Sequence, residues 1–154
     1  MIDYDKCRDE WYEMKQYGPI GKFARHLFLR ILDRINFNSV VDIGCAEGAF
    51  LKDIMKHYPN IKTFGVDISK NVIAETKKEM PDAAFCVLDI QKEGLASKYD
   101  LVTAIALLEH LDNVIQALKN MHEMCEHYLL LTTLQGKKSV GHKRTYNRKN
   151  LVKI

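Results

Sequence analysis

The chain has 154 residues, of which 47% are hydrophobic and 28% are charged, and a formal net charge of +3. These values are ordinary for a globular domain, so they disfavour a disordered chain, and no apolar stretch is long enough to span a bilayer. The length allows one domain with a substantial core.

The cysteines and the N-terminus indicate in which cellular compartment we expect the protein. Cys7, Cys45, Cys86 and Cys125 are scattered, with no C-x-x-C pair among them. That pattern argues against a zinc cluster or a disulfide framework. The first residues have neither the basic nor the apolar region of a secretion signal. We therefore expect a cytoplasmic protein.

Positive charge is concentrated in the last part of the chain. From His127 onward there are seven Lys and Arg residues and no Asp or Glu. Such a basic tail can bind phosphate, nucleic acid or an acidic substrate. It can also be a solvated terminal segment, which is the more common case.

The first predicted elements are helical. Phe23, Leu27, Ile31 and Ile35 recur every fourth residue and predict a helix with an apolar stripe, which we expect to pack on a sheet. An aromatic segment around Trp11 precedes it, and the intervening Gly18-Pro19-Ile20-Gly21 predicts a hinge. We expect a helical cap over residues 1–36 and the main domain over residues 37–154. Whether the Trp11 segment closes over a cleft or packs statically stays open.

Strand and helix patterns alternate from Ser39 onward, which predicts an α/β fold with a parallel sheet and helices on its faces. The expected strands are Val40–Ile43, Thr63–Val66, Ala84–Leu88, Leu101–Ile105 and Tyr128–Thr133. The expected helices are Phe50–His57, Asn71–Met80 with Ser69 as N-cap, and about Asn113–Met124.

A small-residue turn joins the first strand to the next helix. Gly44 and Gly48 bracket this turn, where a ligand can lie against bare backbone. Further polar residues follow the other strands: Asp67, Asp89, and the Glu109-His110 pair. Ligands of an open parallel sheet bind at the carboxyl ends of its strands, so these residues predict a binding site there.

Three segments resemble the class I S-adenosylmethionine-dependent methyltransferases. The D-x-G-x-A-x-G run from Asp42 to Gly48 looks like their motif I, residues 99–111 (YDLVTAIALLEHL) are similar to the segment around their fourth strand, and residues 141–147 (GHKRTYN) resemble the region after their fifth. The resemblance covers about Ser39 to Thr133. It implies a Rossmann-like core with strand order 3-2-1-4-5, S-adenosyl-L-methionine as cofactor and S-adenosyl-L-homocysteine as product.

The resemblance also implies which residues contact the cofactor. Asp67 can accept from both ribose hydroxyls, and Asp89 can accept from the adenine amine while Ile68 and Ile90 pack against the ring. The methionyl end suits the backbone of the glycine turn and the end of strand four. The residues expected there are Asp42, Gly44, Cys45, Ala46, Gly48, Ala104 and Ile105.

Two features depart from the family pattern. Ala46 stands where many members have glycine, and its Cβ disfavours a positive φ. The sequence also stops at Ile154, before the last helix and antiparallel strands of the family can form. The fifth strand would then be an exposed edge. We therefore expect either a piece of a longer protein or a homodimer through that edge.

Two histidines are candidates for catalysis. His110 follows the fourth strand on the ligand side and could act as a base toward a hydroxyl or amine acceptor. It could equally serve only to hold the loop. His142 lies in a basic, glycine-bounded segment that could reach the acceptor; the alternative is that it is an exposed tail histidine.

We expect no metal. Small-RNA 2′-O-methyltransferases resemble this region but use an E-x-x-E-H metal cluster, and Ala106 replaces the first acid here. The remaining two ligands, Glu109 and His110, make a poor site alone.

We therefore expect methyl transfer to an oxygen or nitrogen of a small-molecule acceptor. An RNA methyltransferase is an alternative suggested by the basic tail. A non-catalytic, cofactor-binding partner subunit is another, suggested by Ala46 and the absent last strands. The glycine spacing disfavours an NAD-dependent oxidoreductase. We expect no membrane partner.

Overall fold

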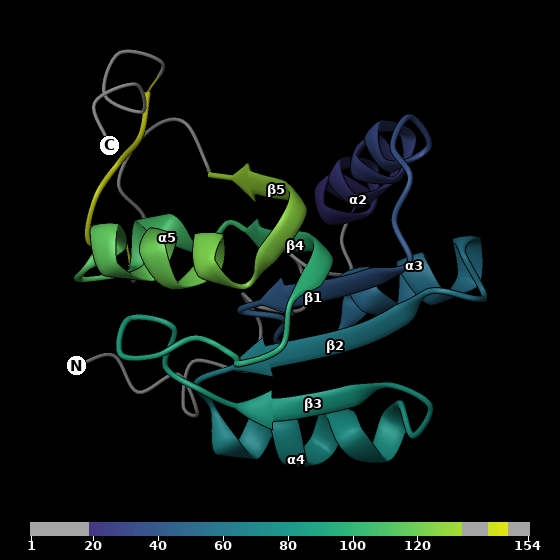
Figure 1. Cartoon of the computed structure of the whole chain (residues 1–154), viewed down its shortest axis with the longest axis horizontal. Helices are drawn as coiled ribbons and strands as arrows, with labels where there is room; N and C mark the ends of the chain where they lie inside the picture. Colours follow the sequence, from purple (N-terminus) through teal and green to yellow (C-terminus); the bar gives the residue numbers. More distant parts are fainter. Residues whose placement is uncertain (1–18, 134–141, 148–154) are drawn as a thin grey trace.

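The computed structural model describes residues 19–133 and 142–147, which form a five-stranded sheet with helices on both faces (Figure 1). The strands are β1 (Ser39–Ile43), β2 (Lys62–Asp67), β3 (Ala84–Val87), β4 (Tyr99–Ile105) and β5 (Cys125–Thr132). The helices are α2 (Pro19–Leu32), α3 (Ala49–His57), α4 (Lys70–Glu79) and α5 (Val114–Glu123), with a 3₁₀ turn η1 (Leu108–His110). In this part of the chain no helix is long and apolar enough to cross a membrane.

The sheet has the order β3-β2-β1-β4-β5, and all neighbouring strands are parallel. This confirms the expected α/β class and strand order. The central strand β1 pairs Val41 with Phe64 of β2 and Val102 of β4. Parallel strands need both faces covered, which explains why Val40, Val41 and Ile43 are 0–1% exposed. The arrowheads in Figure 1 all point to the same edge of the sheet.

One face of the sheet packs against α2, α3 and α4. Alternate strand residues point toward these helices, among them Val40 and Leu101. The helices contribute mainly the following apolar side chains: Leu32, Phe50, Leu51, Ile54 and Ile73. The side chain of Ser69 accepts a hydrogen bond from the Val72 N–H at 3.2 Å, which confirms Ser69 as the N-cap of α4.

The opposite face packs against α5 and η1. Val41 and Val102, next to the residues that face α2 to α4, point to this side. The buried apolar residues of α5 and η1 are Leu108, Val114, Ala117 and Met121, joined by Tyr146 from the segment 142–147. The side chain of Asn113 caps α5 by accepting from the Gln116 N–H at 3.1 Å. The sheet is therefore packed on both faces, and this packing holds the carboxyl ends of the strands in position.

The helix α2 differs from its expected orientation. Three residues of the predicted apolar stripe are exposed: Phe23 at 69%, Leu27 at 48% and Ile31 at 43%. Instead Leu32 is buried, with Phe28 and Leu29 packed beside it. The expectation that the stripe packs on the sheet is therefore wrong for these three residues. The fourth, Ile35, does pack against the core, from the loop after α2.

The predicted hinge is also revised in part. Pro19, Ile20 and Gly21 form the first turn of α2 rather than a break before it. Proline suits the first helical position because its missing N–H has no partner to lose there. Gly18 and the aromatic segment around Trp11 lie outside the described residues. The division into a cap over 1–36 and a domain over 37–154 stays a prediction.

Candidate functional site

Polar and glycine residues from four strands meet at the carboxyl edge of the sheet. The Gly44–Gly48 turn follows β1, and Asp67 is the last residue of β2. Asp89 lies two residues after β3, and η1 follows β4. The parallel register, with Ile43 opposite Val66, sets these strand ends side by side. The fold thus brings these residues together at the edge of the sheet where the sequence predicted them.

The turn after β1 has an unusual backbone. Gly44, Ala46 and Gly48 have φ angles of 75°, 48° and 70°, so every second residue is left-handed. For Ala46 this conformation costs about 1–2 kcal/mol, because its Cβ approaches the carbonyl oxygen. Ala46 therefore adopts the positive φ that its Cβ disfavours. At Gly44 a Cβ would also lie 2.9 Å from Cδ1 of Leu107, so the turn and the loop after β4 touch.

Most backbone N–H groups of this turn are engaged within the protein. Those of Gly44 and Cys45 both donate to the Val66 carbonyl, at 2.7 and 3.0 Å, and that of Gly48 donates to the Cys45 carbonyl at 2.9 Å. The first two of these hydrogen bonds fix the turn on β2, and the third closes the turn on itself. A ligand would meet the remaining carbonyl groups and the bare glycine surface.

Asp67 binds the turn as well as ending β2. Its Oδ2 accepts from the Ala46 N–H at 3.0 Å, and its Oδ1 accepts from the Ser69 N–H at 2.9 Å. The carboxylate therefore has a fixed orientation.

Asp42 is buried beneath the turn, at 4% exposure. The Thr103 hydroxyl donates to its Oδ1 at 2.6 Å. Burial raises the pKa of Asp42 to about 7, opposed by the Thr103 hydrogen bond and reinforced by the negative charge of Asp67. Near neutral pH this carboxyl is therefore shared between its neutral and charged forms.

Asp89 begins a compact loop after β3. Its Oδ1 accepts from the backbone N–H and the side-chain amide of Gln91, at 3.1 and 3.3 Å. Oε1 of Gln91 in turn accepts from the N–H groups of Asp112 and Asn113, at 2.7 and 2.9 Å. Gln91 thus links the Asp89 loop to the start of α5. No motif in the sequence indicated this role.

The two isoleucines expected at an adenine ring have different environments. Ile68 follows Asp67 and is 51% exposed, so its side chain can meet a ligand. Ile90 is 4% exposed and belongs to the core against α5, where its carbonyl accepts from the Asn120 amide at 2.6 Å. The expected ring contact of the Ile90 side chain is therefore not supported.

Three other expected cofactor residues direct their side chains into the core. Cys45 is 3% exposed and Ala104 0%, and Ile105 packs on the face that α2 covers. Burial raises the pKa of the Cys45 thiol, so the thiol stays protonated. Cys45 and Ala104 can therefore offer chiefly backbone atoms to a ligand.

The two candidate catalytic histidines are neighbours. The rings of His110 and His142 lie 4.9 Å apart between centroids, at 87° to one another. Glu109 lies beside them and is 1% exposed. Each of these three residues offers a ligand atom, and these atoms lie within 4.8 Å of one another. His142 is 6% exposed, so the alternative of an exposed tail histidine is wrong.

The segment 142–147 is held against η1. The N–H groups of Lys143 and Arg144 donate to the Glu109 carbonyl, at 2.8 and 3.4 Å. Lys143 forms an ion pair with Asp112, and the Arg144 guanidinium donates to the Asp112 carbonyl at 2.9 Å. Tyr146 is buried in the core. Both described basic residues of the tail therefore contact the protein itself.

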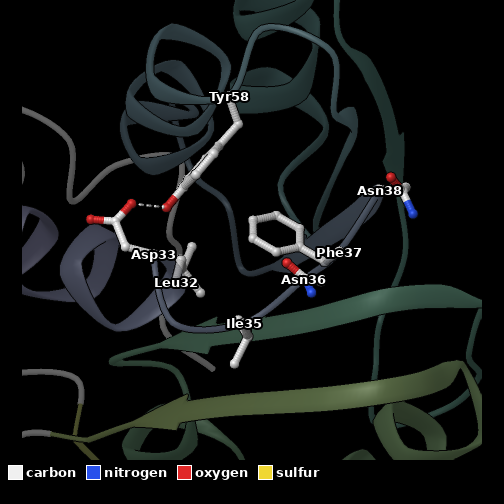
Figure 2. A pocket seen from close by; sticks show the side chains of 7 residues that line it. All are labelled: Leu32, Asp33, Ile35, Asn36, Phe37, Asn38 and Tyr58. Atoms are coloured by element: carbon white, nitrogen blue, oxygen red, sulfur yellow. Dashed lines mark hydrogen bonds between the residues drawn. The ribbon is translucent and has the colours of Figure 1, made fainter.

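A pocket of about 430 Å³ lies elsewhere, at the amino end of β1. Figure 2 shows that it is lined by the loop after α2 and by Tyr58, whose hydroxyl donates to Asp33 at 2.7 Å. Its residues Asn36, Phe37 and Asn38 precede β1 directly. Because the polar edge lies at the other end of β1, this pocket is not part of the candidate site.

Comparisons with known proteins agree with the fold. The chain is 26% identical to a malonyl-[acyl-carrier protein] O-methyltransferase of Bacillus cereus, over 77% of this chain and 47% of that protein. It is 30% identical to a trans-aconitate 2-methyltransferase of Escherichia coli, over 66% of this chain and 37% of that protein. The chain spans less than half the length of these curated relatives.

Solved structures share the architecture. The plantazolicin methyltransferase BpumL, in complex with a pentazolic analog and SAH, superposes with a TM-score of 0.71 at 23% identity, over 86% of this chain and 55% of that one. Coclaurine N-methyltransferase, bound to N-methylheliamine and SAH, superposes with a TM-score of 0.63 at 24% identity, over 72% of this chain and 35% of that one. The family model described as "Methyltransferase domain" matches residues 41–127, from β1 into β5. The chain therefore belongs to the methyltransferase-domain family.

Proposed function

We propose that this chain binds S-adenosylmethionine and takes part in transferring its methyl group to an oxygen or nitrogen of a small-molecule acceptor. One observation carries the proposal: the Gly44–Gly48 turn, Asp67, Asp89 and the histidine pair share one edge of a methyltransferase-family sheet. The names of the relatives support a small acceptor group, since one is named for a malonyl group on acyl-carrier protein and the other for trans-aconitate.

The residues present fit the cofactor. Asp67, whose carboxylate is oriented by two backbone amides, suits a ribose diol because a carboxylate can accept hydrogen bonds from two hydroxyls. Asp89 suits the adenine amine, and the exposed side chain of Ile68 offers an apolar surface for the ring. We do not assign the Ile90 side chain to the ring.

The methionyl end would lie over the turn after β1. Because Gly44 and Cys45 use their N–H groups on β2, we assign the cofactor's ammonium to carbonyl groups of the turn and of Ala104 and Ile105. Asp42, beneath the turn, favours a positive charge above it when ionised. The cofactor supplies an already activated methyl group, so the protein's part is chiefly to align the acceptor.

The acceptor side is assigned to Glu109, His110 and His142. Glu109 and His110 follow β4, and His142 lies against them. The loop after β4 lies next to the turn, because Leu107 approaches Gly44. A group that takes the acceptor's proton, or that polarises its oxygen, is useful at this position.

The two alternatives lead to different observations. An RNA methyltransferase should bind RNA with a steep salt dependence. Lys143 and Arg144 give that reading little support, because both contact Asp112. A partner subunit should bind the cofactor but transfer no methyl group until it meets another chain. The short span relative to the curated relatives favours testing that possibility.

Calorimetric titration with S-adenosylhomocysteine and with NAD tests the cofactor class. We expect binding of the former and none of the latter. Asp67→Asn should weaken S-adenosylhomocysteine binding about 10- to 100-fold, the equivalent of one or two charge-assisted hydrogen bonds. Asp82→Asn, an exposed carboxylate before β3, is the matched control and should bind normally.

Because Asp67 also holds the turn, the thermal midpoint of each variant must be measured alongside. Unchanged affinity in a folded Asp67→Asn variant would show that the ribose assignment is wrong. Binding of NAD without S-adenosylhomocysteine would show that the proposed function is wrong.

A further inference from the structure

The buried group at the end of β4 contains more metal-ligating atoms than the sequence suggested. Glu109 and His110 come from η1, and His142 comes from the returning segment. We call these residues the Glu–His–His cluster. The expectation of no metal rested on two ligands, and the structure supplies a third. The cluster is mostly sealed from water, since Glu109 is 1% and His142 is 6% exposed.

One ring nitrogen of His142 is buried without a hydrogen-bond partner in the described part of the chain, residues 19–133 and 142–147. This nitrogen is Nε2. A buried polar atom left unsatisfied costs about 1–3 kcal/mol. Nearby, His110 presents its ring at right angles, and the carboxylate of Glu109 is within reach of both. A cation placed between the three side chains would satisfy this nitrogen.

The backbone holds the cluster in place. The His110 N–H donates to the Leu107 carbonyl at 2.9 Å, which closes η1. The Lys143 N–H donates to the Glu109 carbonyl at 2.8 Å, and this bond sets His142 opposite Glu109. Buried Tyr146 anchors the same segment in the core. Two segments distant in sequence are therefore fixed before any ion arrives.

The distances allow a metal with little movement. The ligand atoms lie within 4.8 Å of one another. Bonds of about 2.0–2.1 Å from nitrogen or carboxylate oxygen to zinc keep two ligand atoms at most about 4.2 Å apart. Rotations that move a side-chain atom by several tenths of an ångström bring the set into range.

The ligand types select the class of ion. Two imidazoles and one carboxylate are the ligand set of catalytic zinc sites and of related first-row metal sites with open positions. Magnesium and calcium prefer oxygen ligands, which this cluster mostly lacks. We propose that Glu109, His110 and His142 bind one divalent transition-metal ion, such as Zn²⁺, and leave coordination positions open for an oxygen of the acceptor.

This role toward an acceptor rests on the proposed function, whereas metal binding itself does not. With an ion present, His110 and His142 are ligands rather than bases. The ion would then orient the acceptor's oxygen beside the glycine turn. A metal-free histidine pair acting as a base is the competing outcome of the test.

Binding of Co²⁺ to chelator-treated, tag-free protein tests the inference without any assay of activity. We expect one Co²⁺ per chain by calorimetry, visible absorption of a coordinated ion, and its displacement by Zn²⁺. His142→Ala and Glu109→Gln should each weaken Co²⁺ binding by 100-fold or more, since loss of even an outer-shell partner costs about 10- to 100-fold. His122→Ala, on the exposed side of α5, is the control and should bind like the wild type.

Circular dichroism separates loss of the site from loss of the fold, and His142→Asn provides a second variant of similar polarity. The inference is overturned if the wild type binds no stoichiometric Co²⁺, or if folded His142 variants bind it as well as the wild type. Titration with S-adenosylhomocysteine in chelator separates the two proposals. Cofactor binding without Co²⁺ binding leaves the proposed function standing and removes this inference. Co²⁺ binding without cofactor binding leaves this inference standing and removes the proposed function.

Discussion

At the scale of single residues, ionisation of the buried Asp42 carboxyl lowers the stability of the fold. Its carboxyl is buried under the glycine turn, and its pKa is raised to about 7, chiefly by burial. The folded chain therefore holds this proton more tightly than the unfolded chain, in which the pKa is near 3.8. The free energy of unfolding should fall as the pH rises from about 4 to about 7, and then stay level.

We expect Asp42→Asn to remove this pH dependence. The Asn side chain can still accept from the Thr103 hydroxyl but cannot ionise. Each pKa unit corresponds to about 1.4 kcal/mol. As the pH rises from about 4.5 to about 7.5, the free energy of unfolding of the variant should therefore increase by up to about 3 kcal/mol relative to that of the wild type. Urea denaturation at the two pH values measures this. Exposed Asp82→Asn is the control, and a variant-to-wild-type difference that is the same at both pH values would contradict the assignment.

The sequence predicted that polar side chains gather at the ends of the strands, and Asp42, Asp67 and Asp89 do lie there. Whether they contact a cofactor stays a prediction. The burial of the Ile90 side chain was not predicted, since a turn can send a side chain to the ligand or to the core and the sequence pattern does not distinguish the two. Gln91 was missed because its role depends on N–H groups of α5, far away in sequence.

At the scale of elements, α2 shows where helical periodicity fails. A stripe with four-residue spacing was found in the sequence, but Leu32 rather than Leu27 meets the core. The rest of the helix is tied to α3 by polar contacts, including Arg25 to Asp53 at 2.5 Å and Tyr58 to the Leu29 carbonyl at 3.3 Å. Periodicity predicts that a helix forms, while such partners decide which face turns inward.

We expect two leucines of α2 to respond differently to substitution. Leu32→Ala should lower the free energy of unfolding by about 2–5 kcal/mol, because Leu32 is 1% exposed and leaves a cavity. Leu27→Ala should change it by about 0.5 kcal/mol or less, because Leu27 is 48% exposed. Urea denaturation of both variants measures the difference. Equal losses would mean that the face with Leu27 is covered in solution.

Strand positions were predicted more closely than helix orientation. β1 and β2 begin one residue before their expected starts, and α3 and α4 end at or within a residue of their expected ends. Buried parallel strands appear as short apolar runs, and Pro59 and Pro81 mark where the helices before them must stop. β5 starts at Cys125, three residues early, because its polar first half has no apolar pattern to reveal it.

At the scale of the whole molecule, the sequence predicted the sheet order through a family resemblance and raised the possibility that His142 reaches the acceptor, but it did not indicate the contacts that bring the chain back to this edge of the sheet. His142 reaches Glu109 only because Tyr146 inserts into the core and two backbone bonds attach the segment to η1. Such contacts join residues more than thirty positions apart. Their formation depends on three-dimensional packing that no local pattern encodes.

The outer edge of the sheet gives the last prediction. In the described part of the chain β5 pairs only with β4, and Tyr128 on it is 38% exposed. An edge strand of eight residues offers unpaired N–H and C=O groups to another chain. We therefore expect the 154-residue protein to self-associate at high concentration through β5.

Light scattering over a concentration series measures this association. Tyr128→Lys should shift the mass toward the monomer, since a charged side chain on an edge opposes pairing. Ile115→Lys places the same charge at an exposed apolar position on α5, 49% exposed, and should leave the association unchanged. A monomer at every concentration, or equal effects of the two variants, would show that β5 is not the interface.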